Sequence, residues 1–389
     1  MKHRIVVLGA GYAGTGTANS LAKRLHPDDF EITVVDAETE FGERLRYHQL
    51  AVGQDIEPRP LAEMFAGTEI RLVNDRVRGI DPERGTVALD GGEMAYDTLV
   101  YALGSTGSRK DAPGPAAEHV HEVGSRAGAL RLRERLDRLG KADEVLVVGG
   151  GLTGIEAAAE IAEARPDLAV SLADRGEFAA GFTPAGRRYV RRVFEELRVT
   201  VHEHTSLAHV EAEQAITDTG RELPSAATVW AVGFGQHPIA AASGLRTDRE
   251  GRIEVDRDLR STSHPRVWAI GDAALAPGPK GRPLLSRCAS IIPASWRAAD
   301  EITADLTGSR SHRIPVVFLQ QCVSLGRRRG LLQLVSTDDR RPRALLLTGR
   351  TGARYKEMVS RFALRVTANP PRFGSGRLRA RTPQPVVSV

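Results

Sequence analysis

The chain has 389 residues, of which 41% are hydrophobic and 26% are charged, and its formal net charge at pH 7 is +5. This length suits two or three domains, the composition is typical of a soluble globular protein, and the short apolar runs exclude a bilayer-spanning helix. The only cysteines, Cys288 and Cys322, exclude a CxxC pair, a cysteine metal site and a disulfide framework. The N-terminus lacks the pattern of a signal peptide, so we expect a cytoplasmic protein.

The first unit of the chain has the pattern of a dinucleotide-binding domain. Residues 5–8 form an apolar run typical of a buried strand, and Gly9, Gly11 and Gly14 follow it before a helical stretch. The first glycine permits the tight turn, the second lets the backbone approach a pyrophosphate, and the third lets the helix pack close to the strand. A second strand then ends at Asp36, which can accept a hydrogen bond from a ribose hydroxyl. The sequence therefore predicts a dinucleotide at this turn, with its phosphates at the helix N-terminus.

The same pattern returns in the middle of the chain. Residues 145–148 form the strand, and Gly149, Gly151 and Gly154 form the turn before a helix rich in Ala and Glu. The next strand ends at Asp174. Two complete patterns predict two bound dinucleotides.

Asp174 also bears on which nicotinamide nucleotide binds. A carboxylate at this strand end suits the 2′-hydroxyl of NADH and repels the 2′-phosphate of NADPH. Arg175 follows directly and would have the opposite effect. We expect NADH to be preferred on this charge argument.

Three more predicted strands end in glycine. They are YDTLVYALGSTG at 96–107, TVWAVGFG at 228–235 and VWAIGDAA at 267–274, the last with Asp272 directly after Gly271. Residues 109–115 are rich in Pro and Gly and predict a hinge between domains.

The order of these five motifs resembles that of flavoproteins with two dinucleotide-binding domains, the fold of glutathione reductase, the ferredoxin reductases and type II NADH dehydrogenases. The resemblance covers residues 1 to about 305. Within this group, residues 41–53 (FGERLRYHQLAVG) and 320–330 (QQCVSLGRRRG) look most like the type II NADH dehydrogenase branch.

The resemblance implies an α/β fold in which the NAD domain is inserted into a discontinuous FAD domain. The first glycine turn would hold FAD and the second NAD(P)H. The implied divisions are an FAD domain in two parts, 1–108 and 238–308, an NAD(P)H domain at 109–237, a C-terminal segment at 309–368 that serves as an interface, and a disordered tail at 369–389.

The resemblance also implies the cofactor-binding residues. FAD would contact Gly9, Gly11, Tyr12, Ala13, Gly14, Asp36, Arg44, Val77, Ala102, Gly104, Gly271 and Asp272. NAD(P)H would contact Gly149, Gly151, Leu152, Thr153, Gly154, Glu156, Asp174, Arg175 and Gly233. Glu156 would accept a hydrogen bond from the nicotinamide carboxamide and orient the ring for hydride transfer; alternatively it is a helix N-terminal acid that the helix dipole stabilises.

One departure from the glutathione reductase pattern excludes disulfide reduction. The segment after the first acid has no CxxxxC pair, so no thiolate is available there. Arg44, His48 and Gln49 are the polar residues expected near the isoalloxazine. With Glu156, we take Arg44 and His48 as catalytic candidates, and His48 is the proton donor with the most suitable pKa. The alternative is that His48 lies on a helix surface.

A second departure concerns the electron acceptor. Type II NADH dehydrogenases carry two glutamines on the helix beside the flavin, whereas this sequence has Ala289 at the first position and Pro293 near the second. We expect the proline to interrupt the helix. Ile291 and Trp296 offer apolar contacts to a quinone, or are simply core residues.

The C-terminal segment carries the positive charge of the chain. From Ser309 onward there are 17 basic residues and 3 acidic ones. Residues 351–366 predict an amphipathic helix whose apolar stripe contains Tyr355, Met358, Val359, Phe362 and Val366. Such a helix can lie on an anionic membrane, or its stripe can pack on the FAD domain or at a dimer seam.

The leading hypothesis is an FAD-dependent oxidoreductase that takes hydride from NADH and reduces a small acceptor, most readily a quinone. A tailoring enzyme that acts on a specialised metabolite is one alternative, and an NADH-sensing flavoprotein that acts through partners is another. We expect a cytoplasmic protein, peripheral on the inner face of the membrane and able to form a homodimer, with no nucleic-acid partner.

Overall fold

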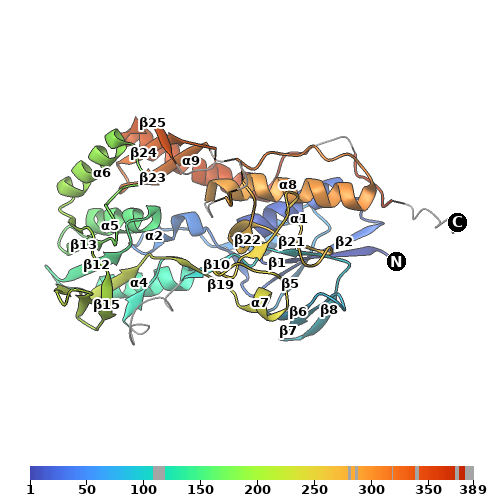
Figure 1. Ribbon diagram of the computed structural model, residues 1–389, viewed down its shortest axis with the longest axis horizontal. Helices are drawn as coiled ribbons and strands as arrows, with labels where there is room; N and C mark the ends of the chain where they lie inside the picture. The colour runs from blue at the N-terminus through green and yellow to red at the C-terminus, as the bar shows by residue number, and fades with distance from the viewer. Residues whose placement is uncertain are drawn as a thin grey trace.

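The computed structural model describes residues 1–107, 119–278, 282–284, 288–317, 319–337, 341–372 and 376–381. Two lobes lie side by side, with the last strands and helix of the chain along one edge of both (Figure 1). The predicted hinge at 109–115 falls outside the described residues.

The first lobe is built on a five-stranded sheet in which all strand pairs are parallel. Its strands, in spatial order, are β21 (Val267–Ala269), β9 (Thr98–Tyr101), β1 (His3–Leu8), β2 (Phe30–Asp36) and β5 (Arg71–Asn74). The apolar runs of β1 and β9 are almost fully buried, as expected for strands covered on both faces. Helix α1 (Tyr12–Arg24) packs against α8 (Cys288–Thr307).

Smaller elements complete this lobe. A three-stranded antiparallel sheet contains β6 (Val77–Asp81), β7 (Thr86–Leu89) and β8 (Gly92–Ala95). The short elements are β3 (Glu40–Phe41), η1 (Arg44–Arg46), α2 (Tyr47–Leu50), β4 (Arg59–Pro60), α3 (Leu61–Met64), α7 (Ile239–Ala242), β20 (Ile253–Glu254), η4 (Gly271–Ala273) and β22 (Ala274–Leu275).

The second lobe repeats the architecture of the first. Its five-stranded parallel sheet has the order β11 (Val120–His121), β18 (Ala227–Trp230), β12 (Glu144–Val148), β13 (Ala169–Ala173) and β14 (Thr200–His202). Its helices are α4 (Arg126–Arg138), α5 (Leu152–Ala164) and α6 (Pro184–Glu196), and an antiparallel sheet contains β15 (Leu207–Val210), β16 (Gln214–Thr217) and β17 (Glu222–Pro224). In both lobes the glycine turn follows the central strand, β1 or β12.

The chain crosses between the lobes through one antiparallel strand pair. β10 (Ser105–Gly107) leaves the first lobe and β19 (Phe234–Gln236) returns to it, and Ser105 pairs with Gln236. β21 then joins the first sheet beside β9. The predicted insertion of one dinucleotide-binding domain into the other is therefore confirmed, while the residue boundaries of the predicted domains stay predictions.

Helix α2 belongs to the first lobe by sequence but packs with the second. Tyr47, Leu50, Ala51 and Ile56 share a buried cluster with the residues of α4, α5 and β12. This contact carries His48 and Gln49 to the boundary between the lobes.

The C-terminal segment bridges both lobes. β23 (Gln320–Ser324), β24 (Gly330–Val335) and β25 (Pro342–Thr348) form an antiparallel sheet that contacts α5 and α6, and α9 (Gly349–Ala368) packs on this sheet and on α1. The buried residues of α9 are small ones, among them Gly352, Ser360 and Ala363. A Cβ on Gly352 would lie 2.4 Å from the Gly330 carbonyl oxygen, so the glycine permits this close approach.

Part of the predicted tail after Asn369 is described. Leu378 forms a bridge with Leu25 at the end of α1, and Arg379 forms ion pairs with Asp28 and Asp29. Residues 373–375 and 382–389 lie outside the description.

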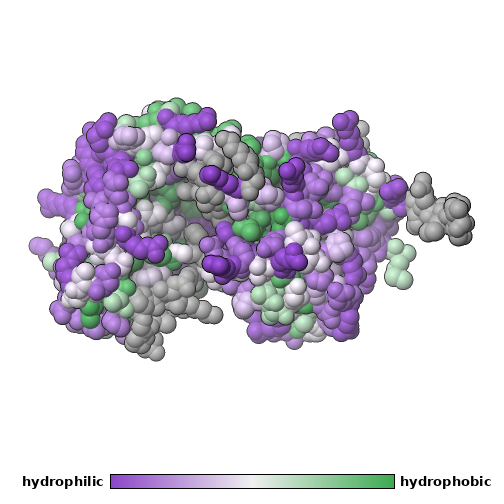
Figure 2. All heavy atoms as spheres, viewed as in Figure 1, coloured by the Kyte–Doolittle hydropathy of each residue, from purple (hydrophilic) through white to green (hydrophobic). Residues whose placement is uncertain are grey.

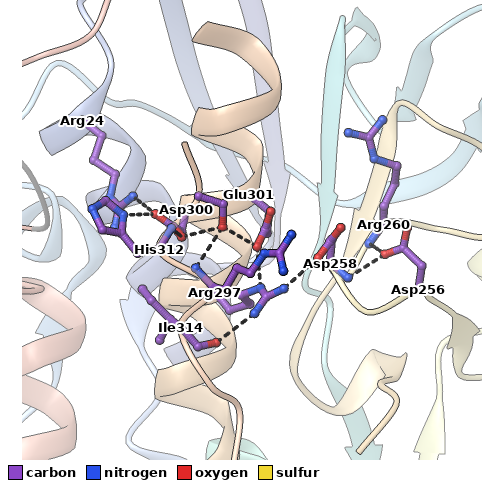
Figure 3. A network of polar contacts seen from close by, with 11 residues as sticks. Arg24, Asp256, Asp258, Arg260, Arg297, Asp300, Glu301, His312 and Ile314 are labelled. Atoms are coloured by element: carbon purple, nitrogen blue, oxygen red, sulfur yellow. Dashed lines mark hydrogen bonds and ion pairs between the residues drawn. The ribbon is translucent and has the colours of Figure 1, made fainter. Parts of the chain in front are cut away.

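A network of polar contacts joins α8 to α1 and to the segments that contain Asp258 and His312 (Figure 3). Arg24 on α1 donates to Asp300 on α8 at 2.6 Å, and both side chains are buried. Asp300 also accepts from the backbone N–H of His312 at 2.6 Å. Arg297, one turn earlier on α8, pairs with Glu301 at 2.7 Å and with Asp258 at 2.7 Å.

Candidate functional site: two dinucleotide cradles and a buried polar cluster

The first glycine turn has the geometry that its pattern predicts. Gly9 has φ +96°, and a Cβ on it would lie 2.4 Å from the Ala102 carbonyl oxygen. A Cβ on Gly14 would lie 1.9 Å from the Gly9 carbonyl oxygen, so the helix can approach the strand only without that side chain. A Cβ on Gly11, in contrast, would meet no described atom within 4 Å. The space in front of Gly11 is open at the N-terminus of α1, where a pyrophosphate would bind.

Asp36 lies at the end of β2 and is held by the turn itself. It accepts hydrogen bonds from the backbone N–H of Ala10 at 2.6 Å and of Glu38 at 2.8 Å. Val77 follows β5, whose last residue pairs with Asp36, and it belongs to the core of the first lobe. The acid is therefore fixed beside the glycine turn, as ribose binding requires.

The glycines of the second turn have the same geometry as those of the first. Gly149 has φ +110°, and a Cβ on it would lie 3.0 Å from the Ala231 carbonyl oxygen. A Cβ on Gly154 would lie 1.9 Å from the Gly149 carbonyl oxygen, whereas Gly151 faces open space. Both turns thus fit a dinucleotide pyrophosphate at a helix N-terminus.

Asp174 is placed differently from Asp36. A Cβ on Gly150 would lie 2.0 Å from the Asp174 carboxylate, so the acid sits directly against the second glycine turn. It accepts from the Gly176 backbone N–H at 3.3 Å, and Arg175 is exposed beside it.

The first turn meets the motif at residues 267–274. Gly271 has φ +69°, and a Cβ on it would lie 3.1 Å from the Ala13 side chain. Ser105 donates to the Asp272 carboxylate at 2.7 Å. Arg44 donates to the Ser105 carbonyl oxygen at 2.8 Å and lies 3.8 Å from Asp272. Residues from three distant parts of the chain therefore meet beside the first cradle.

A buried polar cluster lies where α2, α5, β23 and α9 converge. The Glu156 carboxylate on α5 accepts from the Ser324 backbone N–H at 3.0 Å and pairs with Lys356 Nζ at 3.0 Å. His48 Nε2 lies 3.2 Å from Ser324 Oγ, and His48 Nδ1 lies 3.9 Å from Glu156. All three parts of the chain, the two lobes and the C-terminal segment, contribute to this cluster.

Burial and pairing set the charges of this cluster. Burial alone would raise the pKa of Glu156, but Lys356, His48 and the Ser324 N–H outweigh it and lower that pKa, so the carboxylate stays ionised. Burial lowers the pKa of His48 to about 4, against the opposing attraction of Glu156. His48 is therefore neutral at pH 7 and does not lie on a helix surface.

Three neighbouring residues extend the cluster. Burial raises the pKa of Glu160, one turn after Glu156, to about 7, and Gln54 donates to its carboxylate at 3.0 Å. Arg327 lies 3.7 Å from Glu160. The sequence singled out residues 320–330 without giving a role to Ser324, and it placed Lys356 only among the basic residues of the last helix.

A family model for the pyridine nucleotide-disulphide oxidoreductases matches residues 3–299. The chain belongs to this family. The NADH dehydrogenase-like protein YutJ of Bacillus subtilis is 25% identical over 70% of this chain and 77% of its own length. The type II NADH:quinone oxidoreductase of Staphylococcus haemolyticus is 23% identical over 92% of this chain and 94% of its own length. The structure of NDH2 from Plasmodium falciparum in complex with NADH superimposes with a TM-score of 0.78 at 14% identity, covering 95% of this chain and 98% of that one.

Membership of the pyridine nucleotide-disulphide oxidoreductases agrees with the two cradles. The family makes the protein an oxidoreductase that uses a pyridine nucleotide, and FAD and NADH are the dinucleotides expected in the two cradles. Other residues expected to contact them lie around the turns: Tyr12, Leu152 and Thr153 at the two helix N-termini, and Gly104 and Gly233, with φ +68° and +70°, after β9 and β18.

The expected acceptor residues are divided between two elements. Gln49 is buried on α2 and accepts from Arg46 at 3.0 Å. Ile291 and Trp296 lie half-buried on α8, and Ile291 packs against the core of the first lobe. The side chain of Ala289 lies outside the described residues. Their relation to an acceptor stays a prediction.

The expected interruption of α8 at Pro293 is wrong. The helix runs from Cys288 to Thr307 with the proline inside it. Pro293 is near the start of the helix, so its missing N–H affects a single bond to the first turn. Ser295 donates to the Ile292 carbonyl oxygen at 2.7 Å just beyond it.

Proposed function

We propose that this oxidoreductase takes hydride from NADH and, through FAD, reduces a quinone at a membrane surface. The observation that carries the proposal is the buried cluster of Glu156, Ser324, Lys356 and His48. It holds one ionised carboxylate at the end of the second glycine cradle, on the side where both lobes and the C-terminal segment meet. FAD, when bound, supplies a two-electron carrier between the nicotinamide and the acceptor.

The residues of the chain then have distinct tasks. Glu156 accepts a hydrogen bond from the carboxamide and orients the nicotinamide ring. Lys356 and the Ser324 N–H hold this carboxylate ionised and in place. His48, neutral and buried, fixes Ser324 and is a positioning residue, because its lowered pKa leaves it no extra proton to donate at pH 7.

The position of Asp174 supports a preference for NADH. Its carboxylate lies against the second glycine turn, where the 2′-phosphate of NADPH would be repelled. Arg175 is exposed and forms no ion pair with an acid in the described part of the chain, so it offers the competing attraction. Rates of flavin reduction by the two nucleotides, compared in the native protein and in Asp174→Ser, decide between them; we expect the substitution to raise NADPH use more than it lowers NADH use.

A quinone acceptor is supported by relatives that bear this activity in their names. Ile291 and Trp296 on α8 offer apolar contacts near the first cradle, while Arg44 and Gln49 offer polar ones. Ala289 and Pro293 stand in place of the expected glutamines, and this departure favours a specialised metabolite as the second candidate acceptor.

A membrane contact is supported by the exposed apolar residues of the C-terminal segment. Leu346 on β25 and Met358 and Phe362 on α9 are 49%, 55% and 56% exposed. Figure 2 shows hydrophobic side chains along the edge over β25, flanked by hydrophilic ones. Only part of the predicted stripe is exposed: Tyr355 donates to Gln320, and Val359 and Val366 are half-buried. Within the described residues, no helix is long and apolar enough to cross a membrane.

Stopped-flow reduction tests the proposal. We expect NADH to bleach the flavin band of the purified protein, and Glu156→Gln to slow this step about 10-fold or more at subsaturating NADH, because a charge-assisted hydrogen bond is lost. Glu195→Gln on α6 is the matched control, since Glu195 is exposed. The reduced protein is then mixed with a soluble quinone analogue. Reoxidation no faster than in buffer would reject the quinone, and an unreduced flavin would reject the whole proposal.

A further inference from the structure

An open pocket of ≈ 390 Å³ lies between the turn that joins β23 to β24 and the first half of α9. Among the described residues that line it, the basic ones are Arg327, Arg328, Arg350, Arg354 and Lys356, and Glu357 is the one acid. Ser324 and Lys356 also belong to the buried cluster around Glu156, so the pocket opens from that cluster to the surface.

The charges of the pocket are only partly compensated. Glu357 pairs with Arg327 at 3.3 Å and with Arg361 at 3.0 Å, and Lys356 pairs with Glu156. Three arginines of the pocket are exposed and have no acidic partner across the described ranges: Arg328, Arg350 and Arg354. Three uncompensated guanidinium groups around a concave surface focus a positive potential there.

The face of α9 that lines the pocket continues into an apolar ridge. Arg350, Arg354, Met358 and Phe362 are spaced four residues apart, which places them along one side of the helix. Met358 and Phe362 are more than half exposed. Cationic and apolar surfaces therefore follow one another along a single helix face.

We propose that this pocket binds the phosphate headgroup of one anionic phospholipid, whose acyl chains lie along Met358 and Phe362. Guanidinium groups bind phosphate oxygens bidentately and tolerate the loss of water better than ammonium groups. The ion pair of Arg327 and Glu357 forms part of the pocket wall. Arg328, Arg350 and Arg354 supply the contacts to the phosphate. The inference rests on the proposed membrane contact and adds a defined headgroup site to it.

Monomeric short-chain lipids test the site without a membrane. Binding to the FAD-loaded protein is measured by titration calorimetry with dihexanoylphosphatidic acid, dihexanoylphosphatidylcholine and inorganic phosphate. We expect the phosphatidic acid to bind at least 10-fold more tightly than the other two. Arg350→Gln with Arg354→Gln should weaken it at least 10-fold, and Met358→Ser with Phe362→Ser should weaken it without changing the binding of phosphate.

The matched control is Arg343→Gln with Arg365→Gln. Both arginines are exposed, belong to the same segment, lie outside the pocket and have no acidic partner within the described part of the chain. The pair removes the same charge and should leave phosphatidic acid binding unchanged. Flavin absorbance of each variant reports that it is folded.

Three results would overturn the inference: no binding of phosphatidic acid, equal weakening by the pocket and control variants, or inorganic phosphate binding as tightly as the lipid. The last would assign the pocket to a free phosphate group instead. Sedimentation with anionic vesicles is measured separately. Vesicle binding without phosphatidic acid binding would refute the pocket alone, whereas phosphatidic acid binding without vesicle binding would refute the proposed membrane contact and keep the pocket.

Discussion

Gly11 and Gly14 are both required by the first cradle, but for opposite reasons. Gly11→Val places a side chain in open space, so we expect the protein to fold and to lose FAD, because the valine occupies the pyrophosphate position. Gly14→Ala places its Cβ against the Gly9 carbonyl oxygen and should lower the free energy of unfolding by about 3 kcal/mol. Flavin absorbance after reconstitution and thermal unfolding of the apoprotein measure the two effects. A yellow Gly11→Val protein would contradict the assignment.

Glu160 gives the protein a pH-dependent stability. Burial raises its pKa to about 7, so the folded state binds a proton more tightly than the unfolded state. The contribution of protonated Glu160 to stability is fully present below the pKa that Glu160 has in the unfolded state, and it is lost as the pH rises towards 7. Between pH 5 and pH 8, the free energy of unfolding of Glu160→Gln should therefore fall by about 2 kcal/mol less than that of the native protein. Denaturant unfolding of both proteins at the two pH values measures it, and parallel pH dependences would show that Glu160 is ionised throughout.

Local patterns explain which residues could be predicted. The glycines and Asp36 of the first cradle follow from spacing within one strand–turn–helix unit, and the structure places them as expected. Ser324 could not be assigned to Glu156, because the two residues come together only when the C-terminal sheet packs on α5. The burial of His48 was missed for the same reason: α2 is short, and it packs into the core of the other lobe.

At the scale of elements, the ion pair between Arg24 on α1 and Asp300 on α8 is buried on both sides. Asp300→Asn would remove the carboxylate that pairs with the buried Arg24 guanidinium, so we expect a loss of about 3 kcal/mol in the free energy of unfolding. Asp305→Asn is the matched control on the same helix, because its ion pair with Arg260 is partly exposed and should contribute less than about 1 kcal/mol. Chemical denaturation compares the two variants. Equal losses would mean that the pair with Arg24 has no special weight.

Helix α9 shows what periodicity can and cannot predict. The apolar spacing of residues 351–366 indicates a helix, and the structure has one at Gly349–Ala368. Periodicity suggests that the large apolar residues are buried, whereas the helix packs through Gly352, Ser360 and Ala363. Small residues allow the close approach to β24 and α1, and Met358 and Phe362 are left outside.

At the scale of the whole molecule, the order of motifs is sufficient to predict the architecture. Two parallel sheets that share the order of four strands, β9-β1-β2-β5 and β18-β12-β13-β14, follow from two repeated units, and the pairing of β10 with β19 explains how the chain passes between them. The contribution of the C-terminal segment to both lobes was not predictable, because its contacts join residues far apart in the chain. The same segment supplies Lys356 to the buried cluster and exposes apolar residues to solvent.

This double role of the C-terminal segment predicts two different outcomes for two changes. Truncation before Gly349 removes α9, and with it the partner of Glu156 and the cover over β24 and α1. A buried carboxylate without its partner and a newly exposed core each cost several kcal/mol. We therefore expect the truncated protein to aggregate or to lose FAD.

Met358→Ser with Phe362→Ser changes only exposed side chains of the same helix. We expect this variant to keep its flavin and its NADH-to-ferricyanide activity, since both cradles are untouched. Its binding to anionic vesicles should fall sharply, because the apolar contribution is lost, and the remaining binding should weaken with salt as the basic residues are screened. Flavin content and vesicle sedimentation, measured on the same samples, separate the structural role of α9 from its surface role. Unchanged vesicle binding in this variant would refute the membrane contact through α9.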